Sequence, residues 1–350
     1  MINQVYLDLF NLEATSSFEQ KIATYFKNYI KDYPSYTIKQ DKLGSIFAVK
    51  PSKIKDAPTI MVAGHMDEVG MMVSGITKFG MLKLLNVGGL MGETFISQVL
   101  NVHTKDGVIK GVIGALPPHL RTSQSTKISD LLLDIGASSK EEALSFGVEI
   151  GDMVLFDNPL TYTKNPNRLI SKAIDNRYGC GLALEAIKYF DDKTLPFNLV
   201  IGATVQEEVG LRGAETAVNM FKPDVFLALD ASPVNDHSTE DALGALNEGF
   251  LVRIFDPRNT MHQGLLTYIV DLAKKNDIKY QYFVSKGGTD AAKAMDQLNG
   301  VLATTIGLPA RYIHSTAAMM DTRDLDAARS ILFKILEDIN IDKINEMRDA

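Results

Sequence analysis

Residues 59–68 read TIMVAGHMDE and constrain the fold more than any other stretch of the chain. The run Thr59–Ala63 is rich in β-branched and apolar side chains, which predicts a buried strand. His65 and Asp67 follow that strand at once. After Glu68 the sequence changes character. The stretch therefore predicts a core strand that ends in polar side chains and leads directly into an inserted segment.

The inserted segment runs from about residue 69 to residue 162. Short candidate strands alternate there with glycine-containing turns about every 8–12 residues, a spacing typical of a small barrel or sandwich. The candidate strands are 69–76, 81–86, 99–104, 107–113 and 152–156. We therefore expect residues 69–162 to form a separate all-β, barrel-like domain.

Residues 1–68 and 163–350 together predict one α/β domain. Strands alternate with helices from residue 169 onward, which indicates a mostly parallel sheet flanked by helices. Ser16 and Glu19 have the spacing of a capping box at the start of an early helix. The expected helices are 3–12, 17–31, 175–190, 211–221, 261–276, 289–298 and 324–339, and the expected strands are 36–39, 45–49, 59–63, 197–204, 224–229, 249–255, 280–284 and 301–306.

The composition excludes several classes of partner. The chain has 350 residues, of which 45% are hydrophobic, and a formal net charge of -7. This acidic balance, with no basic cluster, argues against binding to nucleic acid or to an anionic membrane surface. No apolar run approaches the ~18 residues of a membrane span. The N-terminus lacks the features of a secretion signal, and a single cysteine, Cys180, cannot form an internal disulfide. We expect a cytoplasmic protein.

Histidine and carboxylate side chains follow several of the predicted strands. His65, the pair Glu207 and Glu208, Asp230 and His314 each come after a short apolar run. Sites in open α/β sheets form at the carboxyl ends of the strands, so we expect these side chains to converge. Imidazole and carboxylate ligands suit Zn or Co, and Mn shares them. A further carboxylate, Asp175, lies at the start of a predicted helix, and two ions about 3.5–4 Å apart could activate a water.

Each of these residues also has an ordinary structural interpretation. His65 could be a strand-end histidine without a ligand, Asp175 an N-cap, and Asp230 a turn-former. The adjacent Glu207 and Glu208 could be a solvated helix start. Neighbouring strand residues point to opposite sides, however, so Glu208 could be a metal ligand while Glu207 faces the substrate as general base. The joint order of the residues favours the metal site.

Seven motifs spread along the chain resemble those of a known family. They are AGHMDEVG at 63–70, GVIGALPPH at 111–119, DIGASSKEEA at 134–143, AIDNRYG at 173–179, QEEVGLRGA at 206–214, GGTDA at 287–291 and RYIHS at 311–315. Together they resemble the tetrahedral di-metal aminopeptidases and the related bacterial glutamyl aminopeptidases. The resemblance runs nearly from end to end of the chain.

The resemblance implies a role for each candidate residue. Asp175 would bridge two divalent ions, with His65 and Asp230 completing one of the metal sites and Glu208 and His314 the other. The resemblance also implies that Glu207 is the catalytic base and that Asp67 orients His65 from outside the ligand shell. In the same family the inserted domain mediates dimerisation, and six dimers assemble into a hollow tetrahedral particle.

The sequence therefore predicts a metal-dependent aminopeptidase that removes single N-terminal residues from short peptides. Some members of the resembled family prefer acidic first residues, and Lys286, Arg253 and Arg311 are the candidate cations for such a preference. Arg311 could instead pair with a carboxylate. Two alternatives remain at this point: a related di-metal amidohydrolase, such as a deacylase or a carboxypeptidase, and a non-catalytic self-assembling scaffold.

Overall fold

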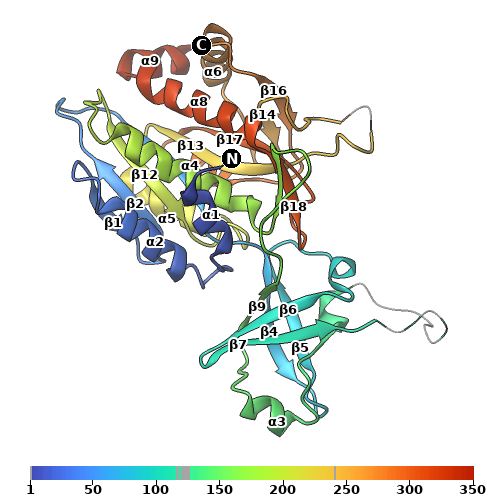
Figure 1. The fold of residues 1–350 in the computed structure, drawn as a ribbon. Helices are drawn as coiled ribbons and strands as arrows, with labels where there is room; N and C mark the ends of the chain where they lie inside the picture. The colour runs from blue at the N-terminus through green and yellow to red at the C-terminus, as the bar shows by residue number, and fades with distance from the viewer. Residues whose placement is uncertain (1, 116, 118, 120–126, 240–241) are drawn as a thin grey trace.

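The computed structural model describes residues 2–115, 117, 119, 127–239 and 242–350 of the chain. Two bodies are visible: a large α/β domain and a small all-β domain that extends from one side of it (Figure 1). Both chain ends lie in the large domain. The predicted fold class, an α/β domain with an inserted β barrel, is confirmed.

Four parallel strands form the centre of the large sheet. They lie in the order β12 (Asn198–Thr204), β3 (Thr59–His65), β13 (Val225–Pro233) and β17 (Leu302–Arg311). Nearly every side chain in these strands is buried, because helices cover both faces of the sheet. Continuous apolar runs such as the one before His65 are what two-sided burial requires.

The margins of the sheet are mostly antiparallel, so the sheet as a whole is mixed. β16 is the exception, because it pairs in parallel with β14 at one edge. Antiparallel pairing joins β2 to β12 and β18 to β17. The marginal strands are β1 (Thr37–Gln40), β2 (Ile46–Lys50), β10 (Thr161–Tyr162), β11 (Arg168–Ser171), β14 (Phe250–Asp256), β15 (Asn259–Thr260), β16 (Tyr280–Val284) and β18 (Ala318–Asp321).

The helices divide between the two faces. Side chains of α1, α2, α4, α6 and α8 share the main hydrophobic core with the sheet, whereas α5 and α7 pack against the opposite face around Phe47, Met61 and Phe226. The helices are α1 (Gln4–Asn11), α2 (Gln20–Ile30), α4 (Ile174–Phe190), α5 (Arg212–Phe221), α6 (Gln263–Lys275), α7 (Asp290–Met295), α8 (Thr322–Asp338) and α9 (Ile341–Asp349).

The capping box expected at Ser16 and Glu19 is wrong. α2 begins at Gln20, and its N-cap, Glu19, makes no side-chain capping bond. The Ser16 hydroxyl instead donates to Asp67 at 2.7 Å, and a Glu19 carboxylate oxygen accepts from the Gln206 amide at 3.1 Å. Both side chains therefore bond to distant segments near the edge of the sheet and not to the first turn of α2.

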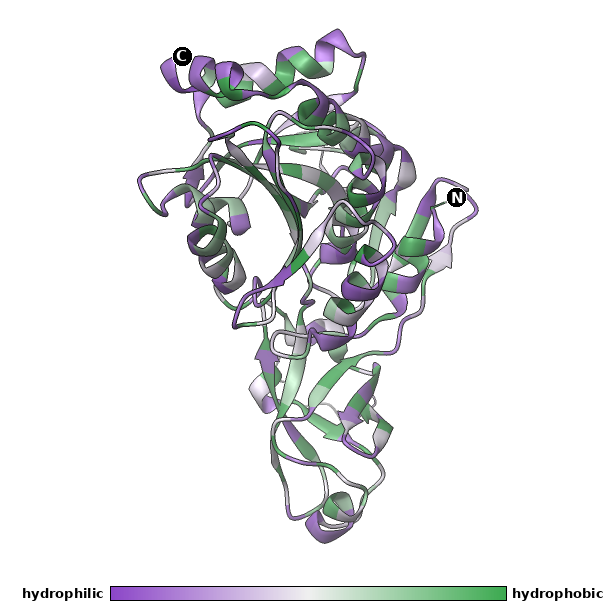
Figure 2. Cartoon of the chain, turned by 90° about the vertical axis from the view of Figure 1, so that its left-hand side faces the viewer, coloured by the Kyte–Doolittle hydropathy of each residue, from purple (hydrophilic) through white to green (hydrophobic). Residues whose placement is uncertain are grey.

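Six strands close the inserted barrel in the order β4-β5-β8-β7-β6-β9. The barrel has its own hydrophobic core, separate from that of the large domain, and its strands carry many apolar residues (Figure 2). The barrel elements are β4 (Gly70–Ile76), β5 (Leu82–Val87), η1 (Gly92–Phe95), β6 (Val99–Thr104), β7 (Gly107–Ile113), η3 (Ile128–Asp130), β8 (Leu132–Asp134), α3 (Lys140–Ser145) and β9 (Met153–Phe156). The chain enters the barrel directly after β3 and returns to the large sheet at β10.

A buried ion cluster lies where the chain crosses between the two domains. Glu68, 1% exposed, follows β3 at the point of entry to the barrel. Its carboxylate accepts from Lys172 at 2.8 and 2.9 Å and from Arg177 at 2.6 Å. Arg177 also donates to the carbonyl of Met66 at 2.6 Å. The cluster joins the outgoing strand to the start of α4, which carries Asp175.

Candidate metal centre

The carboxyl edge of the central sheet brings the predicted site residues together. His65 is the last residue of β3, and Glu207 and Glu208 lie in the turn after β12. Asp230 lies within β13, three residues before its end, because pairing with β17 continues to Pro233. His314 follows β17 in a left-handed conformation with φ of 58°. Four neighbouring strands thus deliver their polar side chains to one edge.

Asp175 stands between the two histidines. Its Oδ1 lies 3.1 Å from Nε2 of His65, and its Oδ2 lies 3.4 Å from Nε2 of His314. Nε2 of His65 is also 3.5 Å from Asp230 and 3.9 Å from Glu207. The alternative of Asp175 as an N-cap fails, because its backbone is non-helical and the capping bond is made by Asn176, whose Oδ1 accepts from the backbone amide of Gly179 at 2.9 Å. Each oxygen of this carboxylate faces a different imidazole.

Glu208 contacts the second histidine of the cluster. Oε2 of Glu208 lies 3.5 Å from Nε2 of His314. The side chains of His65 and Glu208 are almost fully buried, whereas that of His314 is 40% exposed. The cluster is therefore open to solvent on the His314 side and closed on the His65 side.

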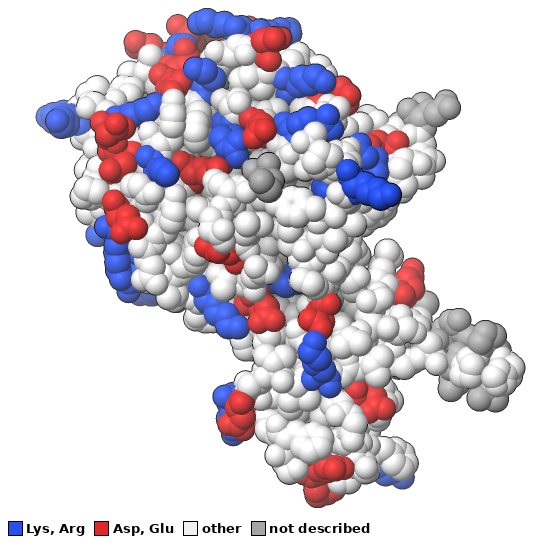
Figure 3. Space-filling view, in the orientation of Figure 1, with Lys and Arg blue, Asp and Glu red and all other residues white. Residues whose placement is uncertain are grey.

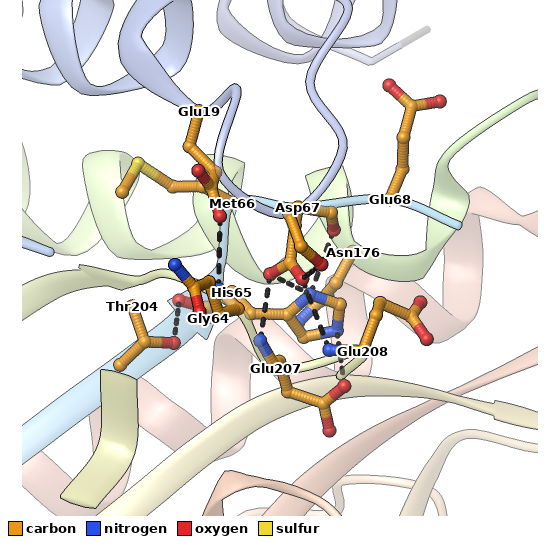
Figure 4. Close-up of polar contacts among 12 residues, drawn as sticks. Glu19, Gly64, His65, Met66, Asp67, Glu68, Asn176, Thr204, Glu207 and Glu208 are labelled. Carbon is orange, nitrogen blue, oxygen red and sulfur yellow. Dashed lines mark hydrogen bonds and ion pairs between the residues drawn. The ribbon is translucent and has the colours of Figure 1, made fainter. Parts of the chain in front are cut away.

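Asp67 anchors both His65 and the glutamate pair. Its backbone carbonyl accepts from Nδ1 of His65 at 2.9 Å. Its carboxylate accepts from the backbone amides of Glu207 at 3.0 Å and Glu208 at 3.1 Å (Figure 4). A carbonyl on Nδ1 leaves Nε2 free to act as a ligand. Asp67 thus fixes the ring of His65 and the position of the turn that carries both glutamates.

The glutamates diverge for a reason that differs from the sequence interpretation. They were expected on a strand, where alternation would send them to opposite sides, but β12 ends at Thr204. The turn begins with Gln206 in a left-handed conformation, φ 55°. Held through its amides by Asp67, this turn directs Glu207 toward His65 and Glu208 toward His314.

Crowded carboxylates perturb one another's pKa values in the cluster. Burial raises the pKa of Glu207 well above its usual range, Asp230 adds to the rise, and His65 opposes it. Burial and the neighbouring Asp175 raise the pKa of Glu208 to about 8. Burial alone would also raise the pKa of Asp175, but His314 and His65 hold it below its ordinary value. Such opposed shifts among adjacent acids are typical of functional sites.

The donor set fits divalent metal ions. Potential ligand atoms within 4.8 Å of one another occur in two groups, His65 with Glu207 and Asp230, and His65 with Asp175 and Glu208. Oε1 of Glu208 is buried and has no hydrogen-bond partner among the described residues. A buried, unpartnered carboxylate oxygen is costly unless a cation or a proton satisfies it. Imidazole nitrogen and carboxylate oxygen are the ligands that zinc and similar ions prefer.

A cavity of about 740 Å³ opens beside this cluster. Lys286 and Arg253, two of the three predicted cations, line it, and so does Arg258, which the sequence interpretation missed. Arg311 does not line the cavity. It makes a bidentate ion pair with Asp236, at 2.7 and 2.8 Å. Arg258 was missed because it follows Asp256-Pro257 in an apparently ordinary turn.

An α/β sheet whose strand ends gather histidines and carboxylates beside a cavity defines a metal-dependent hydrolase. The chain belongs to the M42 peptidase family: the family model described as M42 glutamyl aminopeptidase matches residues 44–331. The protein is accordingly a metal-dependent aminopeptidase, which removes N-terminal residues from peptides. This membership decides against the deacylase, carboxypeptidase and scaffold alternatives.

Two relatives differ in the amino acid after which they are named. The chain is 40% identical to a glutamyl aminopeptidase of Lactococcus lactis subsp. cremoris, over 97% of each chain. It is 33% identical to a lysyl aminopeptidase of Pyrococcus furiosus, over 86% of this chain and 87% of that one. The sequence-based assignment to the glutamyl aminopeptidase relatives is confirmed.

Solved structures agree with the fold over nearly the whole chain. A TET aminopeptidase from a Thaumarchaeota archaeon of marine sediment matches with a TM-score of 0.93 and 30% identity, covering 98% of each chain. The TET1 peptidase of Pyrococcus horikoshii, which can assemble into a tetrahedron or a large octahedral shell, matches with a TM-score of 0.86 and 29% identity, covering 96% of this chain and 99% of that one. Among the described residues, no helix is both long and apolar enough to cross a membrane.

Proposed function

We propose that the cluster holds two divalent ions, bridged by Asp175. His65 and Asp230 complete one metal site, and Glu208 and His314 complete the other. The observation that carries this proposal is the placement of Asp175, because each of its oxygens faces a different imidazole nitrogen. The unpartnered Oε1 of Glu208 supports the second metal site.

Glu207 is the general base in this proposal. It is buried and lies 3.9 Å from Nε2 of His65, but it has no ion pair with His314 among the described contacts. Its ligand atoms also fall within reach of the first metal site, so the geometry admits a ligand role as well. Burial raises the pKa of Glu207 well above its usual range, which favours a group that accepts a proton and returns it.

The residues then divide the reaction between them. When bound, the ions supply Lewis-acid polarisation of the scissile carbonyl and acidify the attacking water. Glu207 takes a proton from that water and delivers it to the nitrogen of the leaving peptide. Asp67 holds Glu207 in place through its amide and fixes the ring of His65 through its own carbonyl.

Metal analysis of Asp175→Ala tests the two-ion assignment. The chelated wild-type protein is loaded separately with Zn²⁺, Co²⁺ and Mn²⁺, and bound metal is counted per subunit. We expect two ions in the wild type and loss of both in Asp175→Ala, because a bridging ligand touches each ion. Retention of one tightly bound ion in the variant would show that Asp175 belongs to a single metal site.

We further propose that the cavity favours acidic N-terminal residues. Lys286 and Arg258 line it, and neither has an ion pair within the described part of the chain. Arg253 is 5% exposed and donates to the carbonyl of Gly287 at 2.9 Å and to Ser232 at 2.7 Å, so it braces the loop that carries Lys286. The Cδ of Arg258 lies beside Gly288 of the same loop. Two unpaired cations on one wall suit a substrate carboxylate.

A substrate panel separates this preference from its alternatives. Glu-, Asp-, Leu- and Lys-aminoacyl substrates are compared on the wild type, Lys286→Gln, Arg258→Gln and the double variant, with Lys105→Gln in the barrel as a control. A charge-assisted bond of about 1–3 kcal/mol predicts a fall of roughly 10- to 100-fold in kcat/KM for Glu and Asp alone. A wild-type preference for lysine or leucine would refute the acidic pocket and leave the metal assignment intact.

The third part of the proposal is self-association through the barrel into dimers, six of which form a dodecamer. The barrel exposes many large apolar side chains, and uncharged areas lie between the charged groups on its visible face (Figure 3). Exposed apolar clusters mark interaction surfaces. The exposed set is Phe79, Leu85, Met91, Val99, Val108, Val112, Leu132, Leu144, Phe146 and Ile150.

A cytoplasmic location completes the proposal, and cell fractionation tests it.

A further inference from the structure

The two histidines of the metal centre are oriented in the same way by groups from different domains. Nδ1 of each ring contacts a backbone carbonyl at 2.9 Å: that of Asp67 for His65 and that of Gly89 for His314. Asp67 is two residues from His65 in the same domain. Gly89 lies in the inserted barrel, 225 residues from His314 along the chain. One metal ligand is thus oriented locally and the other by the barrel.

The barrel reaches His314 through a turn of two glycines between β5 and η1. A Cβ built on Gly89 would lie 3.1 Å from Nδ1 of His314. A Cβ on Gly88 would lie 2.8 Å from a methyl group of Val69 and 3.3 Å from Oε2 of Glu208, and the φ of Gly88, 87°, itself favours glycine. Side chains of any size at these positions would push the turn away from the two ligands.

The contact determines what His314 can do. With its Nδ1–H donating to Gly89, the ring presents a free Nε2 toward Asp175 and Glu208. His314 is also the more exposed of the two histidines, with 40% of its side chain accessible against 2% for His65. Fewer packing contacts therefore hold the ring of His314. Its hydrogen bond to the Gly89 carbonyl matters more for the orientation of the ring than the bond to the Asp67 carbonyl does for His65.

We propose that the Gly88–Gly89 turn of the barrel is a positioning segment for the metal ion held by Glu208 and His314. This inference rests on the two-ion assignment proposed above. The α/β domain alone then provides every ligand of that ion but leaves its imidazole, that of His314, unoriented. Loss of an outer partner of a ligating histidine typically lowers metal affinity about 10- to 100-fold.

Substitutions in the turn test the inference through metal binding. Gly89→Ala and Gly89→Val introduce a small and a larger side chain toward the His314 ring. Gly114→Ala is the matched control, because a Cβ there meets nothing within 4 Å. Co²⁺ titration of the chelated full-length proteins, followed by visible absorption and calorimetry, resolves the two affinities. We expect the dissociation constant of one ion to rise about 10-fold in Gly89→Ala and further in Gly89→Val, while that of the other ion stays unchanged.

A milder variant guards against misfolding. The Asn86 side chain is exposed and donates to the carbonyl of Gly88 at 2.8 Å, so Asn86→Ala loosens the turn without adding bulk. We expect it to weaken the same ion by a few-fold. Equal weakening of both ions, or of neither, in all three turn variants would overturn the positioning role. A wild-type protein that binds fewer than two ions would instead refute the two-ion assignment, and the inference with it.

Discussion

The α/β domain and the barrel differ in how many polar side chains they bury. The α/β domain buries a dense set of ionisable side chains, including His65, Asp67, Glu68 and Arg177, whereas Asn101 is the one buried polar side chain among the described residues of the barrel strands. The barrel instead exposes large apolar residues such as Phe79 and Ile150. A buried charge is costly unless it has a partner, so buried ionisable groups are concentrated around functional sites. Exposed apolar surface is found mainly where another molecule can cover it.

The largest expected effect lies wholly in the α/β domain. Glu207→Gln removes the proposed base but keeps the size of the side chain, so we expect kcat to fall by about 10²–10⁴-fold. Bound metal, thermal stability and oligomeric state should match the wild type, because the Asp67 bond is made to the backbone amide. Steady-state kinetics beside metal analysis checks this. A variant with near-normal kcat would remove Glu207 from the reaction.

The next effect concerns the junction between the domains. Glu68→Gln leaves Lys172 and Arg177 buried without a counter-charge. Breaking a buried ion pair costs about 3–5 kcal/mol, so the free energy of unfolding of the whole chain should fall by that order. Denaturant titration measures the loss. Because all three side chains lie in the α/β domain, we expect the unfolding transition of that domain to shift, and a shift confined to the barrel would contradict this expectation.

A smaller effect should appear on the barrel surface. Val99 and Val112 are directly opposite each other on neighbouring strands, and their side chains are 47% and 39% exposed. Replacing both with Asp should weaken self-association by at least about 10-fold, since charges are poorly tolerated in the core of an interface. Sedimentation over a concentration series measures it, and activity per subunit serves as the control. If the particle is unchanged, deletion of residues 69–162 decides whether any part of the barrel mediates the dimer.

The smallest effect is expected from an exposed ion pair in the barrel. Lys105 and Glu149 approach to 2.6 Å, but their side chains are 66% and 59% exposed. Glu149→Gln should leave the free energy of unfolding close to that of the wild type, because solvent screens such pairs. The same denaturant titration that measures Glu68→Gln measures this variant. A loss comparable to that of Glu68→Gln would mean that burial is not what distinguishes the two pairs.

The sequence predicted that these side chains come together, because most of them follow strands of the central sheet. His65, Glu207 and Asp230 each follow a strongly apolar run, and topology alone carries them to one edge of the sheet. The same reasoning ended the predicted strand 224–229 too early. β13 continues past Asp230 because its partner β17 extends to Arg311. The polar residues after Leu229 gave no sign of this pairing.

Long-range contacts account for most of what the sequence could not predict. No local pattern relates Gly89 to His314 or Ser16 to Asp67, since each contact depends on how two distant segments pack. The short β8, β11 and β18 were also absent from the prediction. Such strands have too few residues for periodicity to indicate them, and the sheet holds them by pairing with neighbours.

The buried cluster around Glu68 has a consequence for how the polypeptide is made. A ribosome releases β3 and Glu68 first, then the whole barrel, and only afterwards Lys172 and Arg177. Until those two cations emerge, Glu68 has no counter-charge with which to be buried, so the end of β3 cannot settle into its final place. Domains fold largely in the order of their synthesis. The barrel, continuous in sequence, can therefore fold before the second half of the α/β domain is made, and the nascent chain presents its proposed assembly surface before it has a complete metal centre.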